Sequence, residues 1–432
     1  MPRSLNFYRY AILSFVGKGT DLTDRLYYRD SFLREFDAQV VSCDREGDRW
    51  KVILDQTAFY PTSGGQPHDL GKLGDAPVVE VLDADGGAVG ADHHVVHYTT
   101  AEVPAGTVHG QVDWARRIDH MQQHTAQHLL SAAFIELFGF QTISFHLGKE
   151  ISTIDLSAPA ITAHHLEEAE RRTNDIIFED RPVVIRFGTA EELAEAGIRK
   201  KVEREGILRA VEIEGFDRQP CGGTHLARTG QAGLLLIRKL ERRRDFWRVE
   251  YVAGYRALAA ARGDFALLGE AATLLSCGFA DVPAGITKMS GERREQFAAA
   301  KRIEERLALL EARALLREHD ESRGAPPGEG SSTDARMVVA AVPEATAAYL
   351  SLLAARLAAV NNVVALLVSR DSGHVVFAQS KGLPTDLGAA LRDCLKEFAG
   401  KGGGSRDFAQ GSLPKPADAD AFLARAANLL KR

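Results

Sequence analysis

The chain has 432 residues, of which 45% are hydrophobic and 26% are charged, and its formal net charge is −6. This composition is typical of a soluble globular protein and, at about 100–200 residues per domain, predicts two to four domains. The negative net charge excludes a chain that is basic throughout, and the lack of any apolar run of about 18 residues argues against a membrane partner.

The first part of the chain is expected to be rich in β-strands. Residues 1–22 are interpreted as an N-terminal extension, because the apolar piece "AILSFVG" is short and no small-residue cleavage site follows it. Over residues 23–115, alternating apolar runs such as "DAQVVSCDREGDRWKVILD" flank a polar turn, which is typical of a hairpin.

Residues 116–255 combine helices with strands. Apolar residues take helical spacing in "RRIDHMQQHTAQHLL", and Gly139 is a stop signal. A charged helix is expected over 162–178. The segment "RAVEIEGFDRQPCGGTHLART" predicts a strand that runs into a glycine loop, and "AGLLLIRKLERRRDFWRVEYVAG" predicts a strand pair.

The last part of the chain changes in composition after Gly254. Residues 256–322 are expected to be helical, and Ile303, Leu307, Leu310 and Ala314 are spaced 4, 3 and 4 apart, which predicts a coiled-coil seam. Residues 323–335 have the composition of a flexible linker. Strands and helices alternate over 336–432, which predicts a small α/β domain.

Two distant fragments carry residues that bind metals. "HTAQHLL" places His124 and His128 four apart on a predicted helix, where Cβ atoms lie about 5–6 Å apart on one face. His93 and His97 are also four apart, but they lie on a predicted strand, where four residues span about 13 Å. Only the helical pair can therefore share an ion.

"CGGTHLA" supplies Cys221 and His225, separated by two glycines that allow a tight bend. Thiolate and imidazole are the ligands that zinc prefers, and four of them close a tetrahedral site, so we predict that Zn²⁺ is bound by His124, His128, Cys221 and His225. A zinc peptidase is excluded, because Thr125 and Gln127 occupy the positions where such enzymes need a glutamate base.

The four cysteines lie far apart in the chain, a spacing that does not indicate a disulfide framework. We therefore predict a reducing, cytoplasmic location.

The segment "YPTSGGQPHDLG" (60–71) is the candidate for substrate binding. Gly64 and Gly65 let the backbone approach a ligand closely, and Thr62, Ser63 and Gln66 provide polar groups beside them. The same segment is also compatible with a plain turn between two strands.

Basic residues gather in "RKKVER" (199–204) and "RKLERRRDFWR" (238–248). Such stretches are either nucleic-acid contacts or solvated charged faces. The candidate contacts are Arg238, Lys239, Arg242, Arg243 and Arg406.

The motifs "FYPTSGGQPHDLG", "HTAQHLL", "SFHLG" and "CGGTHLARTG", in this order, resemble the editing domain of alanyl-tRNA synthetase. The opening "TDRLYYRDSFLREFDAQV" makes the chain more similar to the freestanding alanyl-tRNA editing proteins, the AlaX family. The tail, with "GGGSRDFAQG", resembles the DHH-associated C-terminal domain. The chain departs from the pattern at the bulky Phe246–Trp247 pair and at Ser63, where a third glycine is frequent.

The resemblance implies an α+β protein with a barrel-like β-rich domain (23–115), a zinc-binding editing domain (116–255), a helical or coiled segment (256–322) and a C-terminal α/β domain (336–432). It implies the same four zinc ligands and places Gln66 in a loop that faces the editing pocket, as a catalytic residue. The implied reaction, which needs no ATP, is hydrolysis of the ester between serine, with glycine as second candidate, and the 3′ ribose of tRNA(Ala). The coiled or C-terminal segments would hold tRNA and allow a homodimer.

Two hypotheses stay open at this point: a trans-editing hydrolase, and a zinc-stabilised tRNA-binding module without catalysis. Only the hydrolase needs Gln66 and a polar pocket. Alanine fits any pocket that serine fits, so a hydrolase must recognise the serine hydroxyl. We expect Thr125, beside His124, to read that hydroxyl, and the alternative is that it bonds a carbonyl of its own helix.

Overall fold

The computed structural model describes residues 22–84, 94–195, 197–198, 207–322 and 335–431. The chain folds as two compact units, Met1–Glu270 and Ala271–Arg432. The division falls within helix α4 (Tyr255–Leu275), inside the segment 256–322 that the sequence treats as one helical stretch. The expected N-terminal extension, the linker and the basic stretch 199–204 fall wholly or almost wholly outside the described residues.

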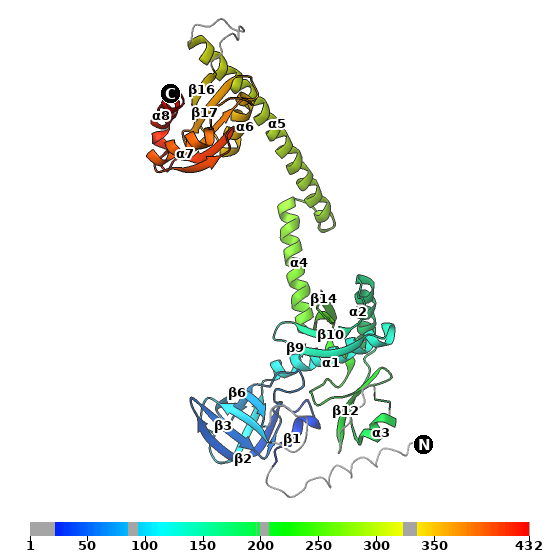
Figure 1. Ribbon diagram of the computed structural model, residues 1–432. Coiled ribbons are helices and arrows are strands. Elements are labelled where there is room, and N and C mark those ends of the chain that lie inside the picture. Colours follow the sequence, from blue (N-terminus) through cyan, green and yellow to red (C-terminus); the bar gives the residue numbers. More distant parts are fainter. Residues whose placement is uncertain (1–21, 85–93, 196, 199–206, 323–334, 432) are drawn as a thin grey trace, which may run out of the picture. The chain divides into compact units, whose positions relative to one another are not determined.

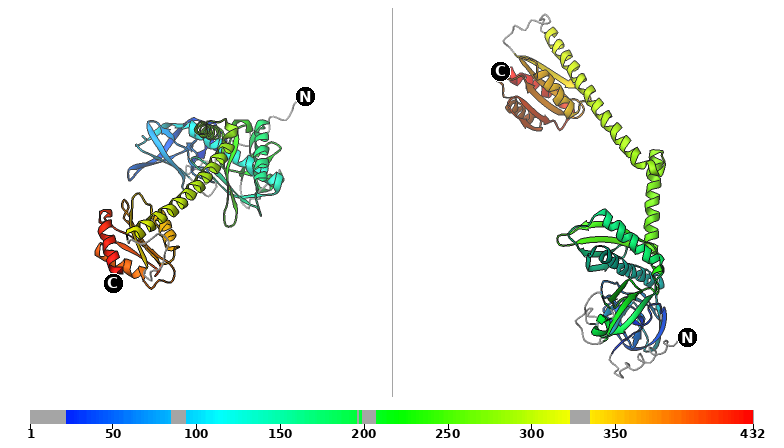
Figure 2. Two further views of the ribbon diagram at one scale, coloured as in Figure 1. Left: turned by 90° about the horizontal axis from the view of Figure 1, so that it is seen from above. Right: turned by 90° about the vertical axis from the view of Figure 1, so that its right-hand side faces the viewer.

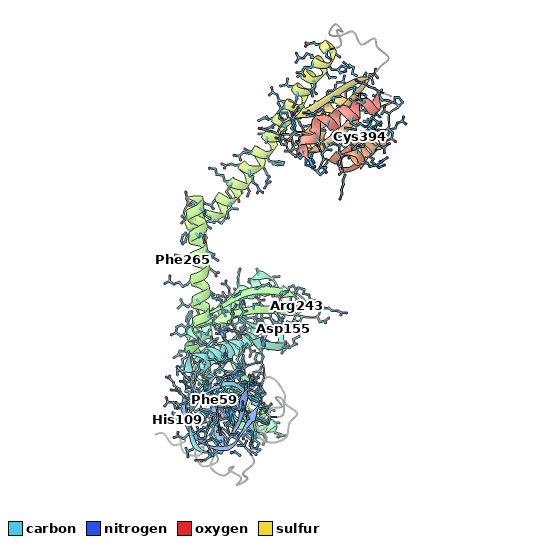
Figure 3. All side chains as sticks on the ribbon, turned by 90° about the vertical axis from the view of Figure 1, so that its left-hand side faces the viewer. Phe59, His109, Asp155, Arg243, Phe265 and Cys394 are labelled. Carbon is cyan, nitrogen blue, oxygen red and sulfur yellow. The ribbon has the colours of Figure 1, made fainter. Side chains whose placement is uncertain are left out.

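A closed six-stranded barrel forms the first part of unit 1, which confirms the barrel-like expectation (Figure 1). Phe59 lies within its core and His109 lies on its surface (Figure 3). A short parallel pair, β1 (Asp24–Arg25) and β4 (Gln56–Thr57), lies outside the barrel. The barrel strands, in their order around it, are β2 (Glu35–Glu46), β3 (Arg49–Leu54), β7 (Val95–Thr99), β6 (Ala76–Asp83), β5 (Gly71–Leu73) and β8 (Gly106–Val112).

Helix α1 (Trp114–Phe138) follows the barrel directly and begins two residues before the predicted start. The Asp113 side chain caps its first turn by accepting from the backbone N–H of Arg116, and Gly139 ends it with φ of 72°, a left-handed conformation that suits glycine. Every residue from His120 to Phe134 is buried. Helix α1 is therefore a core helix, and its polar side chains need partners inside the protein.

Helices α1 and α2 (Ala163–Phe178) pack against a four-stranded antiparallel sheet. Leu129, Leu130 and Phe134 of α1 share this core with Ile154 and Tyr251 of the sheet. The strands, in spatial order, are β14 (Leu235–Arg242), β15 (Trp247–Ala253), β10 (Ser152–Ser157) and β9 (Gln141–Leu147).

A second, three-stranded sheet leads into the glycine loop. It contains β11 (Val183–Gly188), β12 (Leu208–Ile213) and β13 (Asp217–Pro220), with the short helix α3 (Ala190–Glu195) after β11. Strand β13 ends at Pro220, so the hairpin of β12 and β13 delivers Cys221 to the side of α1.

Unit 2 is a five-stranded sheet between two layers of helices (Figures 1 and 2). Strand β17 is buried along its whole length, as expected for a central strand covered on both faces. Helices α5 (Val282–Ser322) and α6 (Ala347–Ala358) cover one face, and α7 (Leu387–Glu397) and α8 (Ala419–Leu430) cover the other. The strands, in spatial order, are β16 (Arg336–Val342), β17 (Val363–Ser369), β18 (His374–Gln379), β20 (Phe408–Ser412) and β19 (Lys401–Gly404).

The predicted coiled-coil seam of α5 is not the face that packs within unit 2. Ile303, Leu307 and Leu310 are exposed by 67%, 52% and 58%, whereas Ala308 and Ala312 are buried in the core shared with α6. Small alanines are what let the two helices approach closely, so the larger apolar residues stay on the outer face of α5. Within the described part of the chain, no single helix has the length and hydropathy of a membrane span; only α4 taken together with Phe279–Ser322 reaches them.

Candidate metal centre

The two metal-binding fragments meet in unit 1. Helix α1 supplies His124 and His128, and the loop after β13 supplies Cys221 and His225. One ligand atom of each residue lies within 4.8 Å of the ligand atoms of the other three. Residues almost a hundred positions apart thus form one compact donor set.

The sulfur of Cys221 lies at the centre of these contacts. Its Sγ is 3.2 Å from His225 Nε2 and 3.5 Å from His124 Nε2, and the Gly223 N–H points to it at 3.4 Å. Burial alone would raise the pKa of the Cys221 thiol, but the neighbouring imidazoles of His124 and His225 hold it well below its usual range. The thiolate, which is the form that binds metals, is therefore favoured here.

Each histidine keeps its Nδ1 for a protein partner. This leaves Nε2 of His124 and His225 facing Cys221, and it fixes the orientation of each ring. The three partners are an amide, a hydroxyl and a carboxylate. The pairs are His124 with Gln66 Oε1 at 2.8 Å, His225 with Thr125 Oγ1 at 3.2 Å, and His128 with Asp217 Oδ2 at 3.5 Å.

This donor set fits a zinc ion. One sulfur and three imidazole nitrogens are the ligands of closed, four-coordinate zinc sites, and polar partners behind the imidazoles are their usual support. Burial alone would lower the pKa of His128, but Asp217 and Cys221 raise it to about 9, so the surroundings favour a positive charge at this position. His120, one turn earlier on α1, is outside the cluster.

Gly223 is required by a close approach. A Cβ atom at this position would lie 2.2 Å from Cε1 and 2.5 Å from Nδ1 of His124. No other residue fits there unless the ligand ring moves, so the second glycine of "CGGTH" serves packing against a ligand rather than loop bending alone.

Gly64 and Gly65 form a tight turn, as one of the two interpretations of this segment expects. Their φ values are 52° and 82°, and Ser63 and Gln66 exchange backbone hydrogen bonds of 3.2 and 2.9 Å across them. Two positive φ values in a two-residue hairpin loop define a type I′ turn, which favours glycine. A Cβ on Gly65 would also lie 2.9 Å from the ring of Phe145, which itself lies beside His124.

The turn sends the Gln66 side chain to the metal centre, where it is fully buried. Its Oε1 accepts from His124 and from the backbone N–H of Thr224 at 3.2 Å, and its Nε2 donates to Thr224 Oγ1 at 2.8 Å. These contacts make Gln66 a residue that positions His124. They leave the expected direct part in catalysis untested.

Thr125 contacts a residue of the candidate metal centre. Its side chain is fully buried, and its hydroxyl contacts His225 Nδ1 and accepts from the Leu226 N–H at 3.2 Å. These contacts make Thr125 a residue that positions His225, and they leave its expected reading of the substrate untested. Thr62 is exposed and its hydroxyl contacts His68 Nδ1 at 2.9 Å, whereas the half-buried Ser63 accepts from Tyr60 through its carbonyl.

The four residues of the candidate metal centre differ in exposure. The three histidines are exposed by at most 5%, whereas Cys221 is half-buried as a residue. Of the other histidine pair, His93 lies outside the described residues, and His97 is buried in the barrel, where its Nε2 is 2.8 Å from Thr57 Oγ1.

Sequence reasoning missed Asp217 and Thr224, which stand behind the ligands. Asp217 opens β13, four residues before Cys221, and only the path of the β12–β13 hairpin shows that it faces His128. The motif contained Thr224 but gave no sign of its bond to Gln66.

The candidate nucleic-acid contacts are partly engaged within the protein. Arg238 forms an ion pair with Asp264, and Lys239 and Arg243 both lie near Glu241. Arg242 lies over the ring of Trp247, 5.0 Å from its centroid. Arg243 and Asp155, which are labelled in Figure 3, belong to the four-stranded sheet that contains the hairpin of β14 and β15. Arg406, in unit 2, donates to the carbonyl of Pro384.

Two segments match known families. Residues 208–250, which include β12, β13 and the Cys221–His225 loop, match the family described as "Threonyl and Alanyl tRNA synthetase second additional domain". Residues 334–432, which include the sheet of unit 2, match the DHHA1 domain.

Whole-chain similarity is found with two kinds of protein. The alanyl-tRNA editing protein AlaX-L of Pyrococcus horikoshii is 30% identical over 398 residues, which cover 91% of this chain and 95% of that protein. The alanyl-tRNA editing protein Aarsd1 of Danio rerio is 27% identical, with coverage of 91% and 96%. The alanine–tRNA ligase of Thermococcus kodakarensis is 32% identical over 94% of this chain, which corresponds to 44% of the ligase.

Proposed function

The chain belongs to the family of alanyl-tRNA editing proteins, and from this membership we propose that it is a trans-editing hydrolase that deacylates mischarged tRNA(Ala). The observation that carries the proposal is the compact set of His124, His128, Cys221 and His225, in which the three histidines are buried and Cys221 is half-buried. We propose that serine is the main amino acid removed and that the protein acts in the cytoplasm. Glycine, the second candidate, has no hydroxyl, so its removal would need recognition other than a bond to a substrate hydroxyl.

We propose zinc as the metal. When bound, zinc supplies a fixed positive charge beside the ester of the substrate. The residues around it keep that charge in place: Gln66 holds the ring of His124, and Thr125 holds the ring of His225. An aminoacyl ester is already activated, so attack by water needs orientation and electrostatic stabilisation more than a strong acid.

Recognition of serine must use its hydroxyl, because alanine is smaller and fits the same space. A site that bonds a substrate hydroxyl can reject the analogue without it by a factor on the order of 10⁴. With Thr125 committed to His225 and Thr62 bonded to His68, we propose that Ser63 reads the hydroxyl. Ser63 is half-buried and belongs to the same turn as Gln66.

The remaining proposals concern the partner. We propose that tRNA(Ala) is held by the basic hairpin of β14 and β15 together with unit 2, in which Arg406 lies. We also propose that the exposed apolar face of α5, formed by Ile303, Leu307 and Leu310, joins two copies of the chain.

The non-catalytic tRNA-binding module stays a second candidate, because four protein ligands fill a tetrahedral shell and such closed sites are typical of structural zinc. The deciding experiment incubates the zinc-loaded protein with Ser-tRNA(Ala) and Ala-tRNA(Ala) and follows loss of the ester. We expect rapid loss from the first and near-background loss from the second. Background rates for both, with zinc bound, would favour the binding module.

Metal content provides a separate test. We expect about one zinc per chain in the parent protein and almost none in Cys221→Ala, because a closed site needs all four ligands. Elemental analysis of the purified proteins measures this. Cys277→Ala is the matched control, since this half-buried cysteine lies outside the cluster and should keep the metal. Full zinc retention in Cys221→Ala would exclude this assignment.

A further inference from the structure

A buried guanidinium lies next to Cys221 of the candidate metal centre. Arg209, on β12, is 9% exposed. Its Nη1 donates to the carbonyl of Cys221 at 2.6 Å, and its own carbonyl accepts from the Cys221 N–H at 3.1 Å. The Arg209 side chain is thus fixed next to Cys221.

The other arginines buried to this degree have carboxylate partners. Arg117 pairs with Asp69, and Arg25 pairs with Asp83. Among the residues that the structure describes, no carboxylate pairs with Arg209: its Nε donates to the Tyr28 carbonyl at 3.1 Å, and its Nη2 has no hydrogen-bond partner. A buried cation that lacks a carboxylate partner, with one N–H donor left without an acceptor, is costly to maintain and calls for an explanation.

The aromatic ring of Tyr28 lies beside the guanidinium of Arg209. The ring of Tyr28, which is half-buried, lies 5.6 Å from the guanidinium carbon. Because Nη2 is buried, the Tyr28 side chain would have to move aside for a ligand oxygen to reach it.

We propose that Arg209 binds an anionic oxygen of the acylated 3′ end of the substrate, beside Cys221. The proposal rests on the proposed function. A guanidinium is suited to this task, because its charged N–H groups make strong, directional bonds to phosphate and to oxyanions. Two oxygens on the substrate have the required chemistry: the phosphate that precedes the terminal adenosine, and the oxyanion that forms on the ester carbonyl during hydrolysis.

The test compares the parent protein with Arg209→Gln, Arg209→Lys and Arg209→Ala on two substrates, a seryl-minihelix and seryl-adenosine, which has no phosphate. Zinc content and thermal unfolding are measured for each protein. We expect Arg209→Gln to keep its zinc and to lose about 100-fold in kcat/KM, in line with removal of one charge-stabilising donor. Arg209→Lys should lose less, and added guanidinium should restore part of the activity of Arg209→Ala.

The substrate arms distinguish the two oxygens. A loss confined to the minihelix identifies the phosphate, and an equal loss on both substrates, in kcat more than in KM, identifies the ester oxyanion. Arg218→Gln is the control, because Arg218 lies on the neighbouring strand β13 and is paired with Glu212. The activity of this variant should stay unchanged.

Two results would overturn the inference. One is full activity of Arg209→Gln with zinc bound. The other is joint loss of zinc and activity in all three variants without rescue by guanidinium, because Arg209 would then only stabilise the loop that carries Cys221. If the parent protein cleaves neither substrate, the proposed function fails instead. Binding of uncleavable 3′-serylamino-3′-deoxyadenosine 5′-phosphate then decides the inference: weaker binding by Arg209→Gln supports it, and equal binding overturns it.

Discussion

Three side chains outside the donor set are expected to influence the metal affinity of the candidate centre. Gln66, Thr125 and Asp217 each face the Nδ1 atom of a different ligand histidine. Such partners set the ring orientation and basicity of a ligand, and their loss typically costs about 10–100-fold in metal affinity. The specificity and the metal affinity of this protein should therefore respond to different hydroxyls.

The variants Thr125→Val and Ser63→Ala test that separation. We expect Thr125→Val to bind zinc about 10-fold or more weakly, because His225 loses its partner, while the ratio of serine to alanine removal stays as in the parent when zinc is saturating. Ser63→Ala should keep its zinc and narrow the ratio. Competition with a fluorescent chelator gives the affinity, and ester loss gives the ratio. The opposite pattern would return the reading of serine to Thr125.

His97 links the stability of the barrel to pH. Its side chain is fully buried, and burial lowers its pKa to about 4, although its contact with the Val52 carbonyl opposes the shift. An unfolded histidine titrates near 6.5, so the unfolded state takes up a proton first as the pH falls. The stability from neutral His97 is present above about pH 6.5 and is lost towards pH 4, in total about 3 kcal/mol.

The measurement is urea unfolding of the parent and of His97→Gln between pH 7.5 and 4. The free energy of unfolding should fall less steeply with acid in the variant, and the difference between the two proteins isolates His97 from the metal ligands. Parallel curves for the two proteins would contradict the assignment.

At the scale of elements, one ion pair ties the turn segment to α1. Arg117 and Asp69 are completely buried, and Arg117 also donates to the carbonyls of Ser31 and Ala58. Asp69 in turn accepts from the backbone N–H of Tyr60. The pair thus anchors both ends of the segment that delivers Gln66.

We expect Asp69→Ala to destabilise the protein by about 3–5 kcal/mol, because it leaves a buried arginine uncompensated. The double variant Asp69→Leu/Arg117→Met should recover much of this loss, since it removes both charges. Urea unfolding monitored by tryptophan fluorescence compares them. A single variant that is as stable as the parent would show that the pair contributes little.

How far the sequence predicts these elements depends on how local the signal is. Helix α1 follows from apolar spacing and from Gly139, and the turn at Gly64–Gly65 from two adjacent glycines. The ligand set is also predictable, because each half is a short motif. The roles of Asp217 and Arg209 are not, since they depend on the register of β12 and β13 and on which face meets α1.

The outer face of α5 illustrates the same limit. Heptad spacing marks Ile303, Leu307 and Leu310 as an apolar seam, but spacing does not say whether a seam packs within the chain. Within unit 2, α6 takes the alanine face instead, because Ala308 and Ala312 allow close packing.

At the scale of the whole molecule, the division into two units predicts a division of labour. All metal ligands lie in Met1–Glu270, and the match to the DHHA1 domain lies in Ala271–Arg432. We expect a chain that ends at Glu270 to keep its zinc and to cleave seryl-adenosine at a rate within a few-fold of the full chain, but to act more weakly on full-length Ser-tRNA(Ala). Loss of activity on the small substrate by a folded, zinc-loaded fragment would contradict this.

The distance along the chain between the two halves of the metal centre also sets an order of events during synthesis. The barrel strands and α1, with His124 and His128, are complete long before Cys221 leaves the ribosome. At about 5–20 residues per second, the 93 positions from residue 128 to residue 221 take roughly 5–20 s to translate. During that interval a nascent chain has only two of its four candidate ligands. Tight metal binding is therefore expected only after the β12–β13 hairpin has been made and packs next to α1.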